Sequence, residues 1–463
     1  MGAQGETSVV RYGTAVHQNE EMCDVRGPRV MAAGIALMIG LTACGGGGGA
    51  ARNEGAVTVP SDPGQVAGTI TVLTNRTDQV QDGTAKAYAA EFNKLYPNVK
   101  VEFQGLTDYE GDVRIRMNSA DYGDVLSIPN SVPTSQYPTF FAPLGSAAEI
   151  SKKYDFTERG TVNGQVYGIA NIGVANGFVY NKAVWQQAGV TGWPKTPAEF
   201  IAALKAIKEK TGATPYYTNY KDAWPLTNWG NAVGSASCDP AANDALATTK
   251  EPWAAGQELN VIDTLLFDIV KNGLSEADPN TTNWENSKNL IATGKIATMW
   301  LGSWAVVQMR DAATKAGGNP DDIGFMPFPA QVDGHFCTAV RPDYQYAINV
   351  HSENKPAARA WIEWFITKSG DAQKALSISS VKGAPLPSSL QPFQDAGVKF
   401  VSLSWAKNAT VLDIDKASEV GLGAPDYRQR LVDVARGAAK GDLPGIFADL
   451  NKKWSEAQAT IGG

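Results

Sequence analysis

The spacing of apolar residues divides the chain into strand-like and helix-like segments. Residues 68–74 and 99–103 alternate apolar and polar side chains, as half-buried strands do. Between them, residues 85–95 carry apolar side chains at helical spacing, and Pro97 ends that segment. A strand, a helix and a second strand in this order predict a βαβ unit with a parallel sheet, and residues 124–128 predict a third strand.

The stretch from Asn163 to Lys182 is the predicted connection between two bodies. It begins with an Asn-Gly turn and continues in short runs of Val, Ile, Tyr and Phe that glycines interrupt. Such a pattern is typical of extended chain with joints where backbone angles change. We expect the hinge within residues 174–177, just after Asn171, and a return crossover near residues 326–329.

After this stretch the apolar spacing becomes mainly helical. Residues 196–199 match a capping box with proline at the first helical position, and amphipathic helices are predicted near 259–270 and 284–293. Residues 294–302 predict a strand, with Ser303 and Trp304 at its carboxyl end, which is where ligands gather in open α/β sheets.

Size and composition narrow the class of protein. A chain of 463 residues exceeds the usual size of a single core, so about two domains are expected. The net charge of −7, without a basic stripe, argues against a nucleic-acid partner. Core packing explains most tryptophans, but a total of twelve also favours a site lined by flat aromatic faces.

The N-terminus matches an export signal. Charged residues at 26–29 precede an apolar run at 30–39 that is too short to span a bilayer comfortably. Residues 41–44, Leu-Thr-Ala-Cys, resemble a lipobox, so we expect residues 1–43 to be removed and Cys44 to be diacylated. An unprocessed signal anchor is the alternative, and Met22 is a possible true start. Residues 44–67, with their glycine run, predict a flexible lipidated tether.

The remaining cysteines leave one question open. Cys238 and Cys337 would share an oxidising compartment, so a disulfide is possible, although sequence cannot show that they are adjacent. No CxxC or HExxH motif occurs, and the three histidines are scattered. We therefore expect no metal site and no cofactor.

Several short segments, in order, resemble one protein family. The chain is similar to the extracellular solute-binding proteins that include maltose-binding protein, the lipoprotein components of ABC importers, over nearly all of residues 68–463. The order and spacing of the segments, together with the lipobox, carry the resemblance. They are residues 89–98, 123–125, 164–168, 179–182, 193–199, 294–299, 302–304 and 357–365.

The resemblance implies two α/β lobes that are joined by crossovers and enclose a ligand in a central cleft. One lobe would comprise residues 68–174 plus 325–378, and the other 179–322 plus 380–463. In this family the lobes close on the ligand and the closed form is recognised by permease subunits. No chemistry on the ligand is required. The protein would be a monomer, anchored by lipid to the outer face of the cytoplasmic membrane.

The family pattern also suggests which residues contact the ligand. Relatives often stack a sugar on the Trp of a Gly-x-Trp turn, here Trp304, and draw an aromatic wall from the region of Trp224 and Trp229. Polar candidates follow strand ends, and Asp343-Tyr344 replaces glycines of many relatives. Lys382 and Trp405 lie where relatives vary. The predicted ligand-binding residues are Asn75, Arg76, Asp78, Asn130, Asn171, Trp224, Trp229, Ser303, Trp304, Asp343 and Tyr344.

Planar hydrogen-bonding groups beside aromatic faces favour a sugar ligand. A polyamine would need more acidic groups, and a phosphorylated polyol more Arg or Lys, than this set provides. An iron chelate remains a further alternative. A secreted glycosidase would need two carboxylates flanking the bond to be cleaved, and no motif places such a pair.

Overall fold

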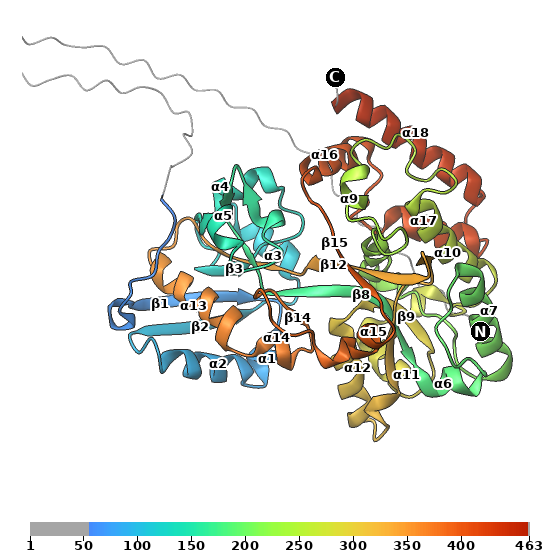
Figure 1. Ribbon diagram of the computed structural model, residues 1–463, viewed down its shortest axis with the longest axis horizontal. Helices are drawn as coiled ribbons and strands as arrows, with labels where there is room; N and C mark the ends of the chain where they lie inside the picture. The colour runs from blue at the N-terminus through green and yellow to red at the C-terminus, as the bar shows by residue number, and fades with distance from the viewer. Residues whose placement is uncertain (1–54, 462–463) are drawn as a thin grey trace, which may run out of the picture. The chain divides into compact units, whose positions relative to one another are not determined.

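A computed structural model describes residues 55–461, which form two α/β lobes around two main sheets (Figure 1). The predicted fold class is therefore confirmed. The predicted signal peptide, the predicted lipidation site Cys44 and the first part of the predicted tether lie outside the described residues.

The first lobe contains the predicted βαβ unit. Strand β1 pairs in parallel with β2, from Gly68 opposite Val99 to Thr74 opposite Gly105, and also with β3. The antiparallel strand β13 comes from much later in the chain. The sheet order is β2-β1-β3-β13-β7, with bounds β1 Gly68–Thr74, β2 Val99–Gly105, β3 Val125–Ser127, β13 Gln345–Ile348 and β7 Ile169–Ala170.

The second sheet is built around the long strand β8, which covers Ile172–Asn181 and runs across the middle of Figure 1. It pairs antiparallel with four strands. Strand β15 then adds to β12 in parallel, and β11 pairs with β12 as a hairpin. The bounds are β9 Thr298–Gly302, β10 Ile323–Met326, β11 Gln331–Val332, β12 His335–Pro342, β14 Ile378–Ser379 and β15 Lys399–Ser402.

Strand pairing places the return to the first lobe later than predicted. Strands β10 and β12 both belong to the second sheet, whereas residues from 325 onward were expected in the first lobe. The chain re-enters the first sheet only at Gln345. The prediction near 326–329 was wrong because the proline-broken apolar segment is buried chain of the second lobe, with Phe328 fully buried in its core.

Helices cover both sheets. In the first lobe they are α1 Thr77–Gln81, α2 Thr84–Asn93, α3 Tyr109–Arg116, α4 Tyr137–Phe140, α5 Ala147–Ile150, α13 Lys355–Lys368 and α14 Asp371–Lys374. In the second lobe they are α6 Lys182–Gln187, α7 Pro197–Lys210, α8 Trp224–Thr227, α9 Ala242–Ala245, α10 Glu258–Lys271, α11 Trp284–Ala292, α12 Trp304–Lys315, α15 Gln391–Asp395, α16 Asn408–Ser418, α17 Asp426–Ala435 and α18 Leu443–Ile461. A small sheet, β4 Gly145–Ser146, β6 Gln165–Val166 and β5 Thr161–Val162, completes the first lobe.

Local signals explain several helix boundaries. The predicted capping box starts α7, where the hydroxyl of Thr196 accepts the backbone N–H of Glu199 at 3.1 Å. On α2, Ala85, Tyr88 and Phe92 are buried as their helical spacing predicts. Leu95 follows the helix and is 37% exposed, so it contributes little to the core.

Part of the predicted tether is folded against the first lobe. Val57 donates its backbone N–H to Pro143 at 2.9 Å, and Val59 packs on the same core cluster. Val66 is fully buried in that cluster. The prediction of a free tether through residue 67 was therefore wrong from residue 57 onward, because these valines bury apolar surface.

The structure contains the Cys238–Cys337 disulfide, the pairing that the sequence left open. Cys337 lies on β12, and Cys238 lies in the loop that follows the 3₁₀ helix η5, Asn228–Ala232. Both pack in the core of the second lobe. The bond therefore fastens two parts of one lobe and does not cross-link the two lobes.

Candidate functional site

The tryptophans of the second lobe fall into two groups. Trp361 and Trp364 lie on α13 of the first lobe, and the other ten of the twelve are in the second. Six of these ten donate their indole N–H to another residue: Trp185, Trp193, Trp229, Trp253, Trp300 and Trp454. Trp224, Trp284, Trp304 and Trp405 donate to no described residue, and all four are at least partly exposed.

Three of the four form one aromatic group, here called the tryptophan cluster: Trp224, Trp284 and Trp304. The rings of Trp224 and Trp284 meet edge to face, with centroids 4.9 Å apart and planes at 79°. The ring centroid of Trp304 lies 5.9 Å from that of Trp224 and 5.8 Å from that of Trp284. Because Trp224 is still 38% exposed, the cluster offers an aromatic face to a solute.

A strained loop holds Trp224 in this position. Asn219 and Ala223 both have positive φ, of 53° and 64°, which is uncommon for residues other than glycine. The Asp222 carboxylate accepts the backbone N–H of Trp284 at 2.8 Å, which ties the loop to the start of α11. Backbone strain of this kind persists where surrounding contacts over-determine it, often at binding sites.

Trp304 is held between β9 and the connection between lobes. It packs against Ile172, Val174 and Ala372, which belong to β8 and α14. A Cβ at Gly302 would lie 2.4 Å from the Trp304 indole nitrogen and 2.6 Å from Val174. Glycine is therefore required at 302 for the indole to lie over this strand end.

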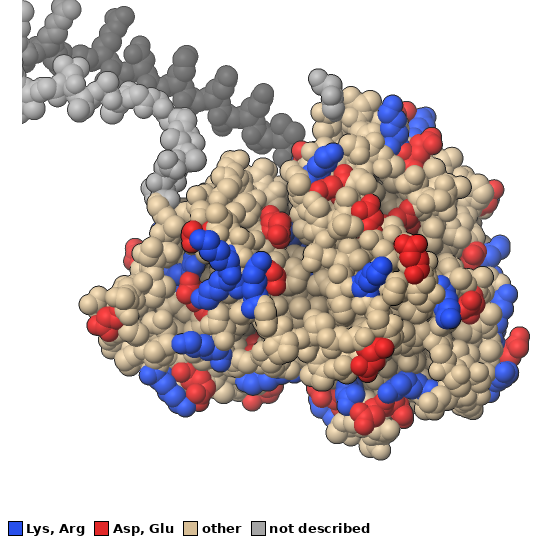
Figure 2. Space-filling model, viewed as in Figure 1, with Lys and Arg blue, Asp and Glu red and all other residues tan. Residues whose placement is uncertain are grey.

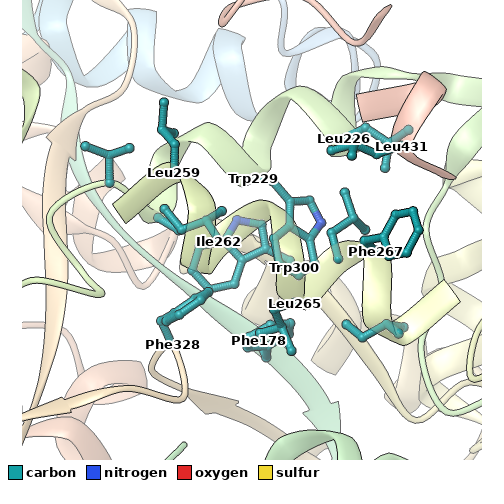
Figure 3. Packing of buried hydrophobic residues seen from close by; sticks show 14 of the residues in the cluster. Phe178, Leu226, Trp229, Leu259, Ile262, Leu265, Phe267, Trp300, Phe328 and Leu431 are labelled. Carbon is teal, nitrogen blue, oxygen red and sulfur yellow. The ribbon is translucent and has the colours of Figure 1, made fainter. Parts of the chain in front are cut away.

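Trp229 does not belong to the site. Its side chain is fully buried among Phe178 and Trp300, and its indole donates to the Tyr216 hydroxyl at 2.9 Å (Figure 3). The prediction that it contacts ligand was wrong because η5 turns this ring inward, whereas α8 leaves Trp224 outside.

Ser303 is also not at the surface. It is fully buried, its backbone N–H donates to Ala175 at 2.8 Å, and its hydroxyl has no partner among the described residues. In this structure it offers no surface to a solute, contrary to the prediction, because Trp304 and β8 cover the end of β9.

In the first lobe, the turn after β1 is polar as predicted. Arg76 and Asp78 form a bidentate ion pair, with Nε–Oδ1 and Nη2–Oδ2 distances of 2.9 and 2.8 Å. Partial burial is the largest single influence on Asp78 and opposes its ionisation, but the hydrogen bond and the charge of Arg76, together with backbone hydrogen bonds, outweigh it and lower the pKa. Asn75 is exposed. Arg76 thus already has a carboxylate partner, which orients its guanidinium.

A hydrogen-bond network links four further residues, two of them predicted and two of them neighbours. The Glu110 carboxylate accepts from the Asn130 side chain at 3.2 Å and from the Tyr344 hydroxyl at 2.9 Å. Arg159 donates to the Asn130 side-chain oxygen at 2.6 Å. Asn130 and Tyr344, which are far apart in sequence, are therefore brought together by Glu110.

Asp343 is half-buried beside two arginines. Its side chain makes no hydrogen bond to another described side chain. Burial raises the pKa of this carboxyl to about 6, and the charges of Arg159 and Arg76 limit the rise. Asn171, on the neighbouring crossover, donates its backbone N–H to Tyr344 at 3.1 Å, while its side-chain oxygen accepts from Ile172 at 2.8 Å.

Sequence reasoning missed three residues of this arrangement. Trp284 was assigned only as the start of a helix, and Glu110 and Arg159 were given no role. The available signal for Trp284 was its position at a helix N-terminus beside a second aromatic segment. Lys382, held as a secondary candidate, forms an exposed ion pair with Asp155 at 3.5 Å.

Other features of the described chain point to no competing centre. A hollow of about 780 Å³ lies between α10 and α18, where Trp253 and Phe447 line it, and none of the predicted site residues borders it. Within residues 55–461 no group of His, Cys, Asp and Glu is arranged to hold a metal ion, and no helix is long and apolar enough to cross a membrane. Charges of both signs are interspersed on the visible face (Figure 2).

Solved structures resemble this architecture along nearly its whole length. BlMnBP1, the binding protein of an ABC transporter from Bifidobacterium animalis subsp. lactis, in complex with mannobiose, is 35% identical and covers 86% of this chain and 96% of its own, with a TM-score of 0.80. The manno-oligosaccharide-specific solute-binding protein BlMnBP2 from the same organism, in complex with mannotriose, is 33% identical with a TM-score of 0.81 and the same coverage.

Sequence comparisons agree with this similarity. The multiple sugar-binding protein of Streptococcus mutans is 23% identical over 66% of this chain and 72% of its own length. The diacetylchitobiose-binding protein DasA of Streptomyces coelicolor is 29% identical, over 44% of this chain and 47% of its own length. Residues 77–372 match the family model for bacterial extracellular solute-binding proteins. The chain belongs to the bacterial extracellular solute-binding protein family.

Proposed function

We propose that this protein captures a carbohydrate between its two lobes and delivers it to the permease of an ABC importer. The observation that carries the proposal is the tryptophan cluster, a half-exposed group of three indoles without hydrogen-bond partners. Sugars present C–H faces that suit such rings and hydroxyl edges that suit polar groups nearby. Arg76, Asp78, Asn130 and Asp343 supply those polar groups from the first lobe.

The relatives support a short oligosaccharide of the mannose type as the first ligand to test. BlMnBP1 and BlMnBP2 are complexed with mannobiose and mannotriose, and both are more than 30% identical to this chain. We also propose the family arrangement in which the exported protein is held by lipid on Cys44 at the outer face of the cytoplasmic membrane. It would act as a monomer and meet the permease subunits there.

The proposal is tested by a thermal-shift screen of the purified protein against mannose, mannobiose, mannotriose, chitobiose and raffinose, with spermidine as the polyamine control. A ligand at one hundred times its Kd stabilises the native state by about 2.7 kcal/mol, which raises the Tm. We expect at least one oligosaccharide to raise the Tm and spermidine to leave it unchanged. A shift with spermidine alone would overturn the carbohydrate proposal.

The glycosidase alternative is separated by a second measurement. Incubating the protein with the same oligosaccharides and separating the sugars afterwards should return each one intact, because a binding protein performs no chemistry on its ligand. Release of shorter sugars would establish an enzyme instead.

A further inference from the structure

The three segments that cross between the lobes meet at Gly173 of β8. Pro342 of β12 pairs with Gly173 on one side, and Ile378 of β14 pairs with it on the other. A change in the angle between the lobes has to pass through these strands, because they connect the two sheets. The crossing lies immediately before residues 174–177, which were predicted as the hinge.

Phe156 lies directly over this crossing and touches both lobes. A Cβ at Gly173 would lie 2.5 Å from the Phe156 ring, so only glycine allows the ring to approach the strand this closely. The ring packs on the second-lobe core cluster that includes Val340 and Ile378. Yet Phe156 belongs to the first lobe, because Tyr154, two residues earlier, is buried in the first-lobe core.

The backbone of Phe156 is strained and held on both sides. Its φ is 61°, which is a genuine outlier for a bulky residue. Just before it, Asp155 donates its backbone N–H to Ser380 at 2.8 Å, and just after it, the Thr157 carbonyl accepts the Thr161 hydroxyl at 2.7 Å. Strain of this kind persists where surrounding contacts over-determine it, and it clusters at binding sites and switch regions.

Phe156 lies on the opposite face of β8 from the tryptophan cluster. Ile172 and Val174 pack with Trp304. Successive side chains of a strand point to opposite faces, so the Cα of Gly173 presents the other face, where the Phe156 ring lies. A sugar on the tryptophan cluster is therefore separated from Phe156 by the crossing strands.

Across the cleft, no polar contact holds the lobes together. Among the described residues, no hydrogen bond or ion pair joins residues 68–168 to residues 182–340. When two bodies rotate about a hinge, groups on one face approach as groups on the opposite face separate. Closure over the tryptophan cluster therefore draws Phe156 away from the second-lobe core.

We infer that Phe156 is a positioning residue that stabilises the open arrangement of the lobes and thereby lowers the affinity for every sugar by the same factor. The ring touches no ligand, so it acts only on the fraction of molecules in the closed arrangement. That fraction multiplies the affinity of each ligand alike. This inference rests on the proposed function.

The test begins with Phe156→Gly, which removes the ring and the strain of a side chain at positive φ. Isothermal titration calorimetry should show tighter binding of mannobiose and of mannotriose by about threefold or more, with one common factor for both sugars. Phe156→Ala, which also removes the ring, should act in the same direction. Melting curves show whether each variant is folded.

Gly173→Ala supplies a double-mutant cycle. Its Cβ would displace the Phe156 ring, so the single variant should also tighten binding of both sugars. In the Phe156→Gly background the same substitution has no ring to displace and should change affinity little. Such non-additivity is the signature of two residues that act through one contact.

Phe103→Ala is the matched control. This ring is also a half-buried phenylalanine of the first lobe, but it packs only on the first-lobe core, against Trp361. Its substitution should leave the affinities for both sugars unchanged.

Small-angle X-ray scattering tests the inference without a ligand. Ligand-free Phe156→Gly should have a smaller radius of gyration than the ligand-free unaltered protein, and mannotriose should compact it less. Phe103→Ala should match the unaltered protein in both states.

Several results would overturn the inference while the proposed function stands. They are unchanged or weaker binding by Phe156→Gly, a gain confined to one of the two sugars, additive effects in the cycle, or equal radii of gyration without ligand. If the unaltered protein binds none of the sugars, the proposed function fails. The scattering of the ligand-free variants then still decides whether Phe156 holds the lobes.

Discussion

Trp224 and Trp229 are only five residues apart, yet they serve different purposes. The Trp229 ring is fully buried and hydrogen-bonded, whereas Trp224 is 38% exposed and its indole N–H has no partner among the described residues. A buried indole whose N–H is satisfied contributes to folding, because it removes apolar surface from water at no polar cost. A half-exposed indole with a free N–H contributes less to folding and remains able to contact a solute.

The same contrast separates two aspartates. Asp263 is fully buried, pairs with Arg428 at 2.9 Å and accepts from the Trp253 indole at 2.8 Å. Asp343 is half-buried beside two arginines and makes no hydrogen bond to another described side chain. Side-chain partners thus fix Asp263 in the core of the second lobe, whereas Asp343 lies between β12 and β13, where the chain crosses between the lobes.

The largest expected effect is on stability. Trp229→Ala leaves a large cavity among Phe178 and Trp300 and removes a hydrogen bond to the Tyr216 hydroxyl, so it should destabilise the fold by roughly 3–5 kcal/mol. Urea unfolding followed by circular dichroism measures this. Trp224→Ala, its neighbour, should cost less than about 1 kcal/mol. Equal unfolding midpoints for the two variants would show that the two rings contribute equally to folding.

Removing the disulfide tests whether the second lobe can be destabilised without affecting lobe closure on the ligand. It closes a loop of 99 residues in sequence, and its loss in a Cys238→Ser, Cys337→Ser double variant should cost roughly 2–4 kcal/mol. Thermal unfolding reports the loss. We expect lobe closure to survive, because the bond lies within one lobe. Small-angle X-ray scattering with and without ligand checks this, and a lost ligand-induced compaction would show that the bond controls the hinge.

Trp304→Ala should lower ligand affinity with little loss of stability. Removing a half-buried platform at the centre of the cluster should weaken binding of mannotriose by about tenfold or more, equivalent to at least about 1.4 kcal/mol. Calorimetric titration measures the change. Gly302→Ala is a useful companion, because its Cβ would displace the same indole. An unchanged affinity in both variants would exclude stacking on Trp304.

The smallest expected effect concerns Asp343 and pH. Burial raises the pKa of its carboxyl from 3.8 to about 6, so between these values the folded protein binds more protons than the unfolded chain. The stability contributed by this group is present below pH 4 and is lost as the pH rises to 6. Asp343→Asn should remove this loss and raise the free energy of unfolding by roughly 1 kcal/mol at pH 7. This value is discounted because the side chain is partly exposed. The Tm of the two proteins is measured from pH 4 to pH 7. A constant difference in Tm over this range would contradict the raised pKa of Asp343.

Much of the fold follows from patterns that span few residues. The alternation in residues 68–74, the spacing of Ala85, Tyr88 and Phe92, and the capping box at Thr196 each depend on neighbours in sequence, and the structure agrees with them. The return between lobes was misplaced because the segment near Pro329 shows the composition of a crossover. The strand just before this segment, β10, pairs with β8, which is distant in sequence. Only this pairing shows that the segment stays in the second lobe.

The site was less predictable because its contacts are long-range. Nothing near Trp229 shows that its ring meets Trp300, seventy-one positions later, and nothing near Trp284 shows that it meets Trp224. Glu110, Asn130 and Tyr344 converge from three separate elements. Sequence shows which residue types are present, but whether an indole or a carboxylate finds a partner is decided by the fold.

The tryptophans whose indole N–H has no partner among the described residues are expected to bind the sugar. The most direct measurement is calorimetric titration of mannobiose and mannotriose into the unaltered protein, Trp224→Ala and the control Trp193→Ala. We predict that the unaltered protein and the control bind with equal affinity, and that Trp224→Ala binds about tenfold more weakly with an unchanged Tm. Equal binding by all three proteins would show that Trp224 does not contact the sugar.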